Sequence, residues 1–143
     1  MTAFDLAQRY VGIAELSGEK NHPLIQWWLS LCGFGTDAPD EVPWCSAFVN
    51  GIAWELRLPR SKSAAARSWL EVGRPVLAND EQIGFDVAVL SRGNTPTQGH
   101  VGFFGGLKDG SVYVLGGNQN NSVSVEKFAA SRILEIRRLS PTV

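Results

Sequence analysis

The chain has 143 residues, of which 44% are hydrophobic and 19% charged, so its composition is that of a globular protein rather than a disordered one. Thirteen Lys and Arg against fourteen Asp and Glu leave a net charge of −1, which lacks the basic excess typical of nucleic-acid binders. No stretch approaches the roughly 20 apolar residues that span a bilayer. We predict a single domain over residues 1–143.

The start of the sequence does not resemble a signal peptide, because Asp5 and Arg9 stand where an apolar core is needed. We therefore expect a protein made in the cytoplasm without a signal peptide. The two cysteines, Cys32 and Cys45, are too few for a disulfide scaffold, and their spacing to the two histidines matches no zinc pattern. We expect neither a metal nor another cofactor.

Helical periodicity dominates the first half of the chain. Pro23 and Gly33 bracket one short helix, and the apolar residues that follow Trp44 recur about every four positions until Pro59. The spacing predicts four helices, over residues 2–16, 23–33, 44 to 56–58, and 63–73.

Behind these helices the period of the apolar residues changes from 3.6 to 2. Five β-branched or apolar runs bounded by Gly, Asn and Pro predict strands at 85–90, 100–106, 111–117, 122–125 and 133–139. The short connections imply antiparallel neighbours, because parallel strands need a crossover. We predict an α+β fold in which N-terminal helices pack on a meandering antiparallel sheet of about five strands.

Cys45 lies in the first turn of the third predicted helix, where the stretch D-E-V-P-W-C-S-A-F-V-N passes from a polar turn to an apolar run. The unpaired N–H groups and the positive end of the helix dipole favour a thiolate there. Cys45 is therefore a candidate nucleophile. A lone cysteine in an apolar helix is, however, more often a small buried apolar residue. Cys32 is expected to be a buried structural thiol.

A thiolate nucleophile needs a base that holds its proton and delivers it to the leaving group. His22 suits a helix cap, whereas His100 begins the alternating strand Q-G-H-V-G-F-F, where Gly102 leaves room above the imidazole. If the next strand pairs antiparallel, its polar end brings Asn118 back to His100, with Gln119 as the second candidate to orient the ring. A satisfied strand histidine and an ordinary turn explain the same residues without chemistry.

Together these blocks resemble the NlpC/P60 and CHAP cysteine peptidases, papain-like enzymes that cut bacterial peptidoglycan. The resemblance is carried by P-W-C-S-A-F-V-N, G-H-V-G-F-F and V-L-G-G-N-Q. It extends to Gly18–Ile25, to the block A-A-R-S-W-L at 65–70, to D-V-A-V-L, and to the closing R-I-L-E-I-R-R. It therefore covers most of the chain and implies the papain-like NlpC/P60 fold.

The resemblance implies Cys45 as nucleophile, His100 as base and acid, and Asn118 as the orienting residue. Many relatives have Gly-Asp where this chain reads G-F-D, which leaves Asp86 without a clear role. The tyrosine that many relatives carry upstream of the cysteine is missing, so only the Cys45 backbone N–H is named as an oxyanion donor. The residues expected to contact substrate are Trp44, Ser46, Gln119 and Asp40, although Asp40 is also a candidate helix cap.

The function that we predict is hydrolysis of a peptidoglycan amide through a cysteine thioester, at a bond within the stem peptide or between muramic acid and L-alanine. We expect a monomer that acts at the bacterial cell wall or in the periplasm, delivered by a phage or by secretion, for example as an endolysin, a tail enzyme or an effector. An inhibitor, immunity or export partner is left open. Two alternatives are a non-catalytic wall-binding or structural module and a papain-like peptidase or deamidase with a protein substrate. A wall-binding or structural module would have Cys45 and His100 too far apart for a hydrogen bond. An enzyme with a protein substrate would have a narrow acidic or apolar cleft.

Overall fold

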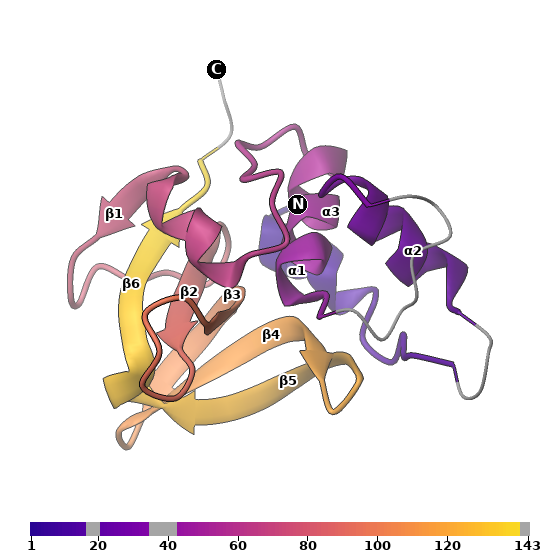
Figure 1. The fold of residues 1–143 in the computed structure, drawn as a ribbon. Helices are drawn as coiled ribbons and strands as arrows, with labels where there is room; N and C mark the ends of the chain where they lie inside the picture. Colours follow the sequence, from indigo (N-terminus) through magenta and orange to yellow (C-terminus); the bar gives the residue numbers. More distant parts are fainter. Residues whose placement is uncertain (17–20, 35–42, 141–143) are drawn as a thin grey trace.

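The computed structural model describes residues 1–16, 21–34 and 43–140, and all structural statements below concern these residues. Figure 1 shows the three α-helices gathered on one side of the sheet. The helices are α1 (Ala3–Gln8), α2 (Pro23–Ser30), α3 (Cys45–Glu55) and the 3-10 helices η1 (Ala66–Glu71) and η2 (Ala130–Arg132). The strands are β1 (Arg74–Val76), β2 (Asp86–Ser91), β3 (Gly99–Lys108), β4 (Ser111–Gln119), β5 (Ser122–Ala129) and β6 (Ile133–Arg138).

The six strands form one antiparallel sheet in the order β1-β6-β2-β3-β4-β5. The predicted meander is therefore right from β2 to β5, but β6 returns to the other side and pairs with β2. In a flat sheet β5 and β6 would lie about 19 Å apart, at about 4.8 Å per strand. The three residues of η2 that join them can span only about 14 Å. The sheet must therefore curl.

The curl gives the sheet two apolar faces. The helices cover the outer face, where Phe48 and Ile52 of α3 pack with Val101 and Phe103 of β3. The inner face holds a smaller cluster, which comprises Ala88, Leu90, Phe104, Val112, Val114 and Ile136. Alternate residues of one strand thus serve both faces, as the period of two predicted.

The sheet has six strands rather than the five expected from the sequence. The additional strand, β1, is three residues long, contains Pro75 and pairs only with β6 at the edge of the sheet. Proline is tolerated there because an edge strand has no neighbour on its outer side, so an N–H that faces that side is not needed for pairing. A strand this short and this exposed shows no alternation that a sequence pattern could reveal.

The first helix is shorter than the predicted span 2–16. It begins at a capping box between Thr2 and Asp5 and ends at Gln8. The segment that follows pairs with the start of β5 instead: Gly12 N–H donates to the Val123 carbonyl, and Val123 N–H donates to the Ile13 carbonyl. Tertiary pairing here outweighs the helical spacing of the apolar residues. The predicted helices at 23–33 and from 44 are confirmed as α2 and α3, and the expected helix at 63–73 is the 3-10 helix η1.

Candidate active site

Cys45 is the first residue of α3 and faces the point where β3 and β4 separate. The pairing of β3 with β4 extends from Lys108↔Ser111 to Phe103↔Leu115, so that residues 99–102 pair with β2 alone. The backbone N–H of Val101, in this stretch, lies near enough to the Cys45 thiol to lower its pKa. The nucleophile candidate thus lies near the residue that follows His100.

Cys45 is only 7% exposed. Burial raises the pKa of Cys45 above the ordinary value, while backbone N–H groups of Val101 and Ser46 and the charge of Arg92 act in the opposite direction. The helix-start effect expected from the sequence is present, but desolvation outweighs it. In the free protein the thiol is therefore neutral near pH 7, and a thiolate has to form together with proton transfer. Cys32, the other cysteine, is also a free thiol.

His100 is 2% exposed, and its Nε2 lies 2.8 Å from Oε1 of Gln119. The Gln119 amide has a defined orientation, because its Nε2 donates to the carbonyls of Val114 (3.2 Å) and Ser124 (2.8 Å). Its oxygen must therefore accept, which assigns the ring proton to Nε2 of His100. Nδ1 is left with a lone pair, and this buried nitrogen has no hydrogen-bond partner among the described residues.

Burial also keeps the imidazole neutral. It lowers the pKa of His100 to about 4, with smaller contributions from Arg92 and Arg132 in the same direction, and the hydrogen bond to Gln119 opposes the shift. The Phe128 ring lies 5.3 Å from the imidazole, centroid to centroid, and adds to the apolar surroundings. A neutral imidazole with a free Nδ1 lone pair is the protonation state that a general base needs.

The residue that contacts the imidazole is Gln119, the second candidate, rather than Asn118. A register shift between Gly116 and Gln119 interrupts the pairing of β4 with β5, and Asn118 adopts a positive φ of 59° within it. A one-residue irregularity exchanges the faces on which the following side chains lie. Gln119 therefore points to the face of His100, whereas no hydrogen bond joins Asn118 to the ring in the described part of the chain.

Two glycines of β4 make room for this arrangement. A Cβ at Gly116 would lie 2.6 Å from Oε1 of Gln119 and 3.5 Å from Nε2 of His100. A Cβ at Gly117 would lie 2.6 Å from the Trp44 ring. The G-G pair thus lets the His100–Gln119 pair lie on one face of β4 and the start of α3 on the other.

Trp44 and Ser46, both expected to contact substrate, are 0% exposed. Trp44 packs in the helix-side core and donates from Nε1 to Glu15 at 2.8 Å. Ser46 donates to the Ser63 carbonyl at 2.6 Å and accepts from Trp69 Nε1 at 2.8 Å. This burial is a correction to the sequence interpretation, since the residues beside a nucleophile at a helix start turn into the protein rather than toward the solvent.

Asp40, the remaining residue expected at the substrate, lies outside the described residues. Asp86, which had no clear role, is buried and forms a structural ion pair: its two oxygens accept from Arg138 at 2.6 and 2.9 Å. Its position in β2, away from Cys45 and His100, assigns it to the sheet rather than to the site.

Two adjoining cavities reach the candidate residues. One, of about 280 Å³, is lined by Arg92, His100, Asn118, Gln119, Asn120, Glu126, Lys127 and Phe128. The other, of about 230 Å³, is lined by Pro43, Cys45, Ala64, Ala66, Arg92, Thr97, Gln98, Gly99 and Asn118. The two cavities share Arg92 and Asn118, so these two side chains lie between the cavity that contains Cys45 and the cavity that contains His100. Sequence reasoning missed Arg92, which lies in a polar loop with no motif around it.

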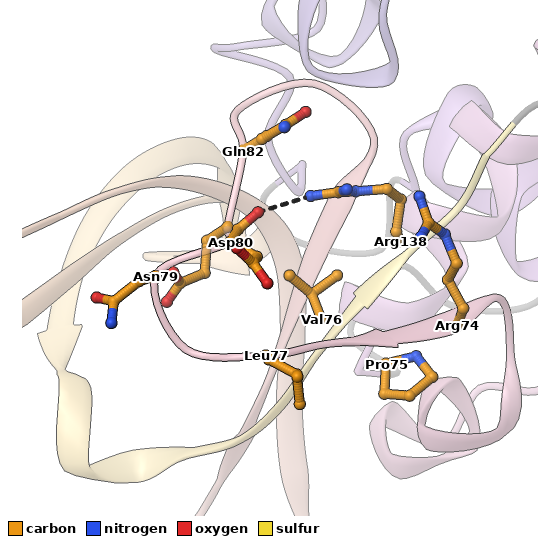
Figure 2. Close-up of a pocket in the computed structure, with 9 residues that line it drawn as sticks. Arg74, Pro75, Val76, Leu77, Asn79, Asp80, Gln82 and Arg138 are labelled. Carbon is orange, nitrogen blue, oxygen red and sulfur yellow. Dashed lines mark hydrogen bonds between the residues drawn. The ribbon is translucent and has the colours of Figure 1, made fainter.

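A separate cavity of about 450 Å³ lies at the β1–β6 edge and contains none of the candidate residues. Figure 2 shows Arg138 reaching toward Asp80 beside Val76 and Gln82. The guanidinium donates to the Asp80 carbonyl at 2.9 Å, in addition to its ion pair with Asp86. This arginine therefore serves to fix the loop after β1.

Within the described ranges, no three His, Cys, Asp or Glu side chains are grouped in a way that could hold a metal ion. A search of the same ranges for a helix with the length and hydropathy of a membrane span finds none.

Of the three comparisons with known proteins, the one with solved structures finds a match, and this match concerns the fold alone. No family model matches the sequence. No curated protein matches it either. Among solved structures, the structure of NlpC1 from Trichomonas vaginalis is similar, with a TM-score of 0.56 and 15% sequence identity. The match covers 96% of this chain and 42% of that chain. At this identity it shows a shared α+β fold, consistent with an NlpC/P60-like architecture.

Proposed function

We propose that this chain is a cysteine hydrolase of peptidoglycan amides, in which Cys45 is the nucleophile, His100 the base and acid, and Gln119 the residue that orients His100. The observation that carries the proposal is the His100 ring itself: Gln119 holds Nε2, Nδ1 is left unpartnered, and the N–H of the next residue lies near enough to the Cys45 thiol to lower its pKa. The similarity in fold to the NlpC1 structure supports the proposal at the level of the fold.

The reaction would proceed through a thioester. Sγ of Cys45 attacks the amide carbonyl while the thiol proton passes to Nδ1 of His100, and the backbone N–H of Cys45 stabilises the oxyanion. The imidazolium then protonates the leaving amine, the C–N bond breaks, and the acyl group remains on sulfur. Water, deprotonated by the same nitrogen, releases the acid and restores the thiol. The bond would lie in the stem peptide or next to muramic acid, after delivery of the protein to the cell wall.

The decisive experiment compares purified protein with its Cys45→Ala variant on intact peptidoglycan, followed by mass spectrometry of the soluble fragments. We expect fragments only with the wild-type protein, and their new termini identify the bond. A Ser46→Ala variant is the control for damage to the start of α3, because it alters the neighbouring side chain but leaves the thiol. Equal fragment patterns for wild type and Cys45→Ala would refute hydrolysis by Cys45.

A second candidate function is a non-catalytic wall-binding module. One observation favours it: within the described residues no hydrogen bond joins the Cys45 thiol to His100, and burial keeps the thiol neutral. Peptidoglycan sedimentation separates the two functions. If the chain is a binding module, the wild type and Cys45→Ala should sediment with peptidoglycan alike, and no fragment should be released. If it is a hydrolase, Cys45→Ala should bind peptidoglycan and the wild type should release fragments.

A further inference from the structure

Arg92 occupies the boundary between the two cavities of the candidate active site. It directly follows β2, where Ser91 pairs with Gly99, the residue before His100. Its side chain lines both the cavity that contains Cys45 and the cavity that contains His100. A group bound by Arg92 would therefore lie beside whatever occupies the space between the thiol and the imidazole.

Among the described residues, the charges that line these cavities are mainly positive. Arg92 is the one charged residue of the described ranges that lines the Cys45 cavity. On the His100 side it is joined by Lys127 and by Glu126. The Glu126 carboxylate already accepts from Asn120 at 3.1 Å and from Ser124 at 3.2 Å. An anion that enters these cavities would thus meet two cationic side chains and one carboxylate that is already hydrogen-bonded, as far as the described residues go.

Arg92 differs from the other two arginines near the site in its hydrogen bonds. Arg67 donates to the carbonyls of Gln98 (2.7 Å) and Thr95 (3.1 Å), and Arg132 donates twice to the Ser91 carbonyl. These two guanidinium groups hold loops in place. Arg92 is exposed and makes no hydrogen bond or ion pair with another described residue, so its fork of five N–H donors is available to a ligand.

Arg92 also lies close enough to act on the reacting groups. Its charge lowers the pKa of the Cys45 thiol and the pKa of His100. By lowering the pKa of His100, Arg92 disfavours the imidazolium that has to form when Nδ1 takes the thiol proton. A substrate anion on Arg92 would offset that repulsion at the step where the positive charge appears.

We propose that Arg92 is a specificity-determining residue that selects peptides bearing a carboxylate next to the scissile amide. This assignment deepens the proposed function and rests on it for the reaction, but the binding step can be measured without turnover. Planar guanidinium and carboxylate groups pair through two parallel hydrogen bonds, and a carboxamide in the same place cannot accept both.

The test uses one muropeptide in two forms, with a free α-carboxylate on its glutamate or with that group as the carboxamide. Binding of both forms is measured by calorimetry in a Cys45→Ala background, with Arg92 present, as Arg92→Ala and as Arg92→Lys. Rates are measured in parallel with the thiol intact. Lys108→Ala, at the exposed far end of β3, is the matched control for the loss of one positive charge.

With Arg92 present, we expect the carboxylate form to bind about 10- to 100-fold more tightly, the range of one charge-assisted hydrogen-bonding contact. Arg92→Ala should remove this preference, Arg92→Lys should retain part of it, and Lys108→Ala should leave it unchanged. If the carboxylate form is preferred over the carboxamide form to the same extent with and without Arg92, the proposal is overturned. If the preference depends on Arg92 but no fragment is released by the wild type, the binding site stands and the proposed hydrolysis fails.

Discussion

Gln119 determines which nitrogen of His100 carries the proton. Its amide donates to two carbonyls and can therefore offer the ring only an acceptor. The consequence is a neutral imidazole with its lone pair on Nδ1, held in one orientation before any substrate binds. Such preorganisation is what separates a base from a histidine that is merely buried.

Replacement of Gln119 by Ala should lower kcat about 10- to 100-fold, because the lost hydrogen bond no longer fixes the ring or its tautomer. Steady-state hydrolysis of muropeptides measures the effect. Asn118→Ala, which removes a side chain that lines both cavities, should raise KM instead. A drop in kcat for Asn118→Ala as large as that for Gln119→Ala would return the orienting role to Asn118.

The buried imidazole also predicts how stability depends on pH. The folded-state pKa of His100 is about 4, below the ordinary value of 6.5 that applies to the unfolded chain. Its contribution is fully present above pH 6.5 and is lost as pH falls from 6.5 through 4, since the unfolded state binds the proton first. The loss amounts to about 3 kcal/mol, at about 1.4 kcal/mol per pKa unit.

Urea unfolding of the wild type and of His100→Gln at several pH values between 4 and 7 isolates this contribution, because the carboxylates titrate in both proteins. We expect the difference in free energy of unfolding between them to shrink as the pH falls. Parallel curves for the two proteins would contradict the depressed pKa.

At the scale of elements, one ion pair joins β2 to β6 and to the loop after β1. Asp86 is buried in β2, and Arg138 at the end of β6 contacts both its carboxylate and the Asp80 carbonyl. Removal of one member of such a pair leaves the other charge without its partner at a mostly buried site. This costs more than the pair itself contributes.

Asp86→Ala should therefore lower the free energy of unfolding by about 3 kcal/mol while the alkylation rate of Cys45 stays near that of the wild type. Chemical denaturation and iodoacetamide kinetics give the two readouts. Glu135→Ala serves as comparison, because its ion pair with Arg137 is partly exposed and should contribute under about 1 kcal/mol. A strong change in thiol reactivity in Asp86→Ala would place Asp86 in the active site after all.

The elements also explain what the sequence could and could not predict. The start of α3 and the beginning of β3 follow from local patterns, so Cys45 and His100 could be named from the sequence. The irregularity at Gly117 and Asn118 depends on packing against Trp44, and no alternation of residue types reveals it. It moves one side chain to the other face, and the sequence therefore favoured Asn118 over Gln119.

Other differences have similar causes. The residues after Gln8 keep a helical spacing of apolar side chains, yet they pair with β5, a partner more than 100 residues away that a local pattern cannot indicate. Trp44 and Ser46 were expected at the substrate because they flank Cys45. A helix turns 100° per residue, so neighbours in sequence leave the cleft at once, and both are buried.

At the scale of the molecule, the two apolar clusters depend on the same strands. β2 sends Val87 and Val89 to the helix-side cluster and Ala88 and Leu90 to the inner one. Neither cluster can lose its strands without exposing the other. Urea unfolding should therefore show one transition, with far-UV circular dichroism and tryptophan fluorescence coinciding. Two separated transitions would show that the helices and the sheet unfold independently.

The position of β6 has a consequence for the order in which the chain acquires its structure. β6 follows every other strand in the sequence, yet it lies between β1 and β2, and β1 has no other partner in the sheet. During synthesis on the ribosome, β1 must therefore wait until residues 133–138 have emerged, while β2 to β5 can already pair as hairpins. Insertion of this strand is a late, long-range step of the kind that slows folding.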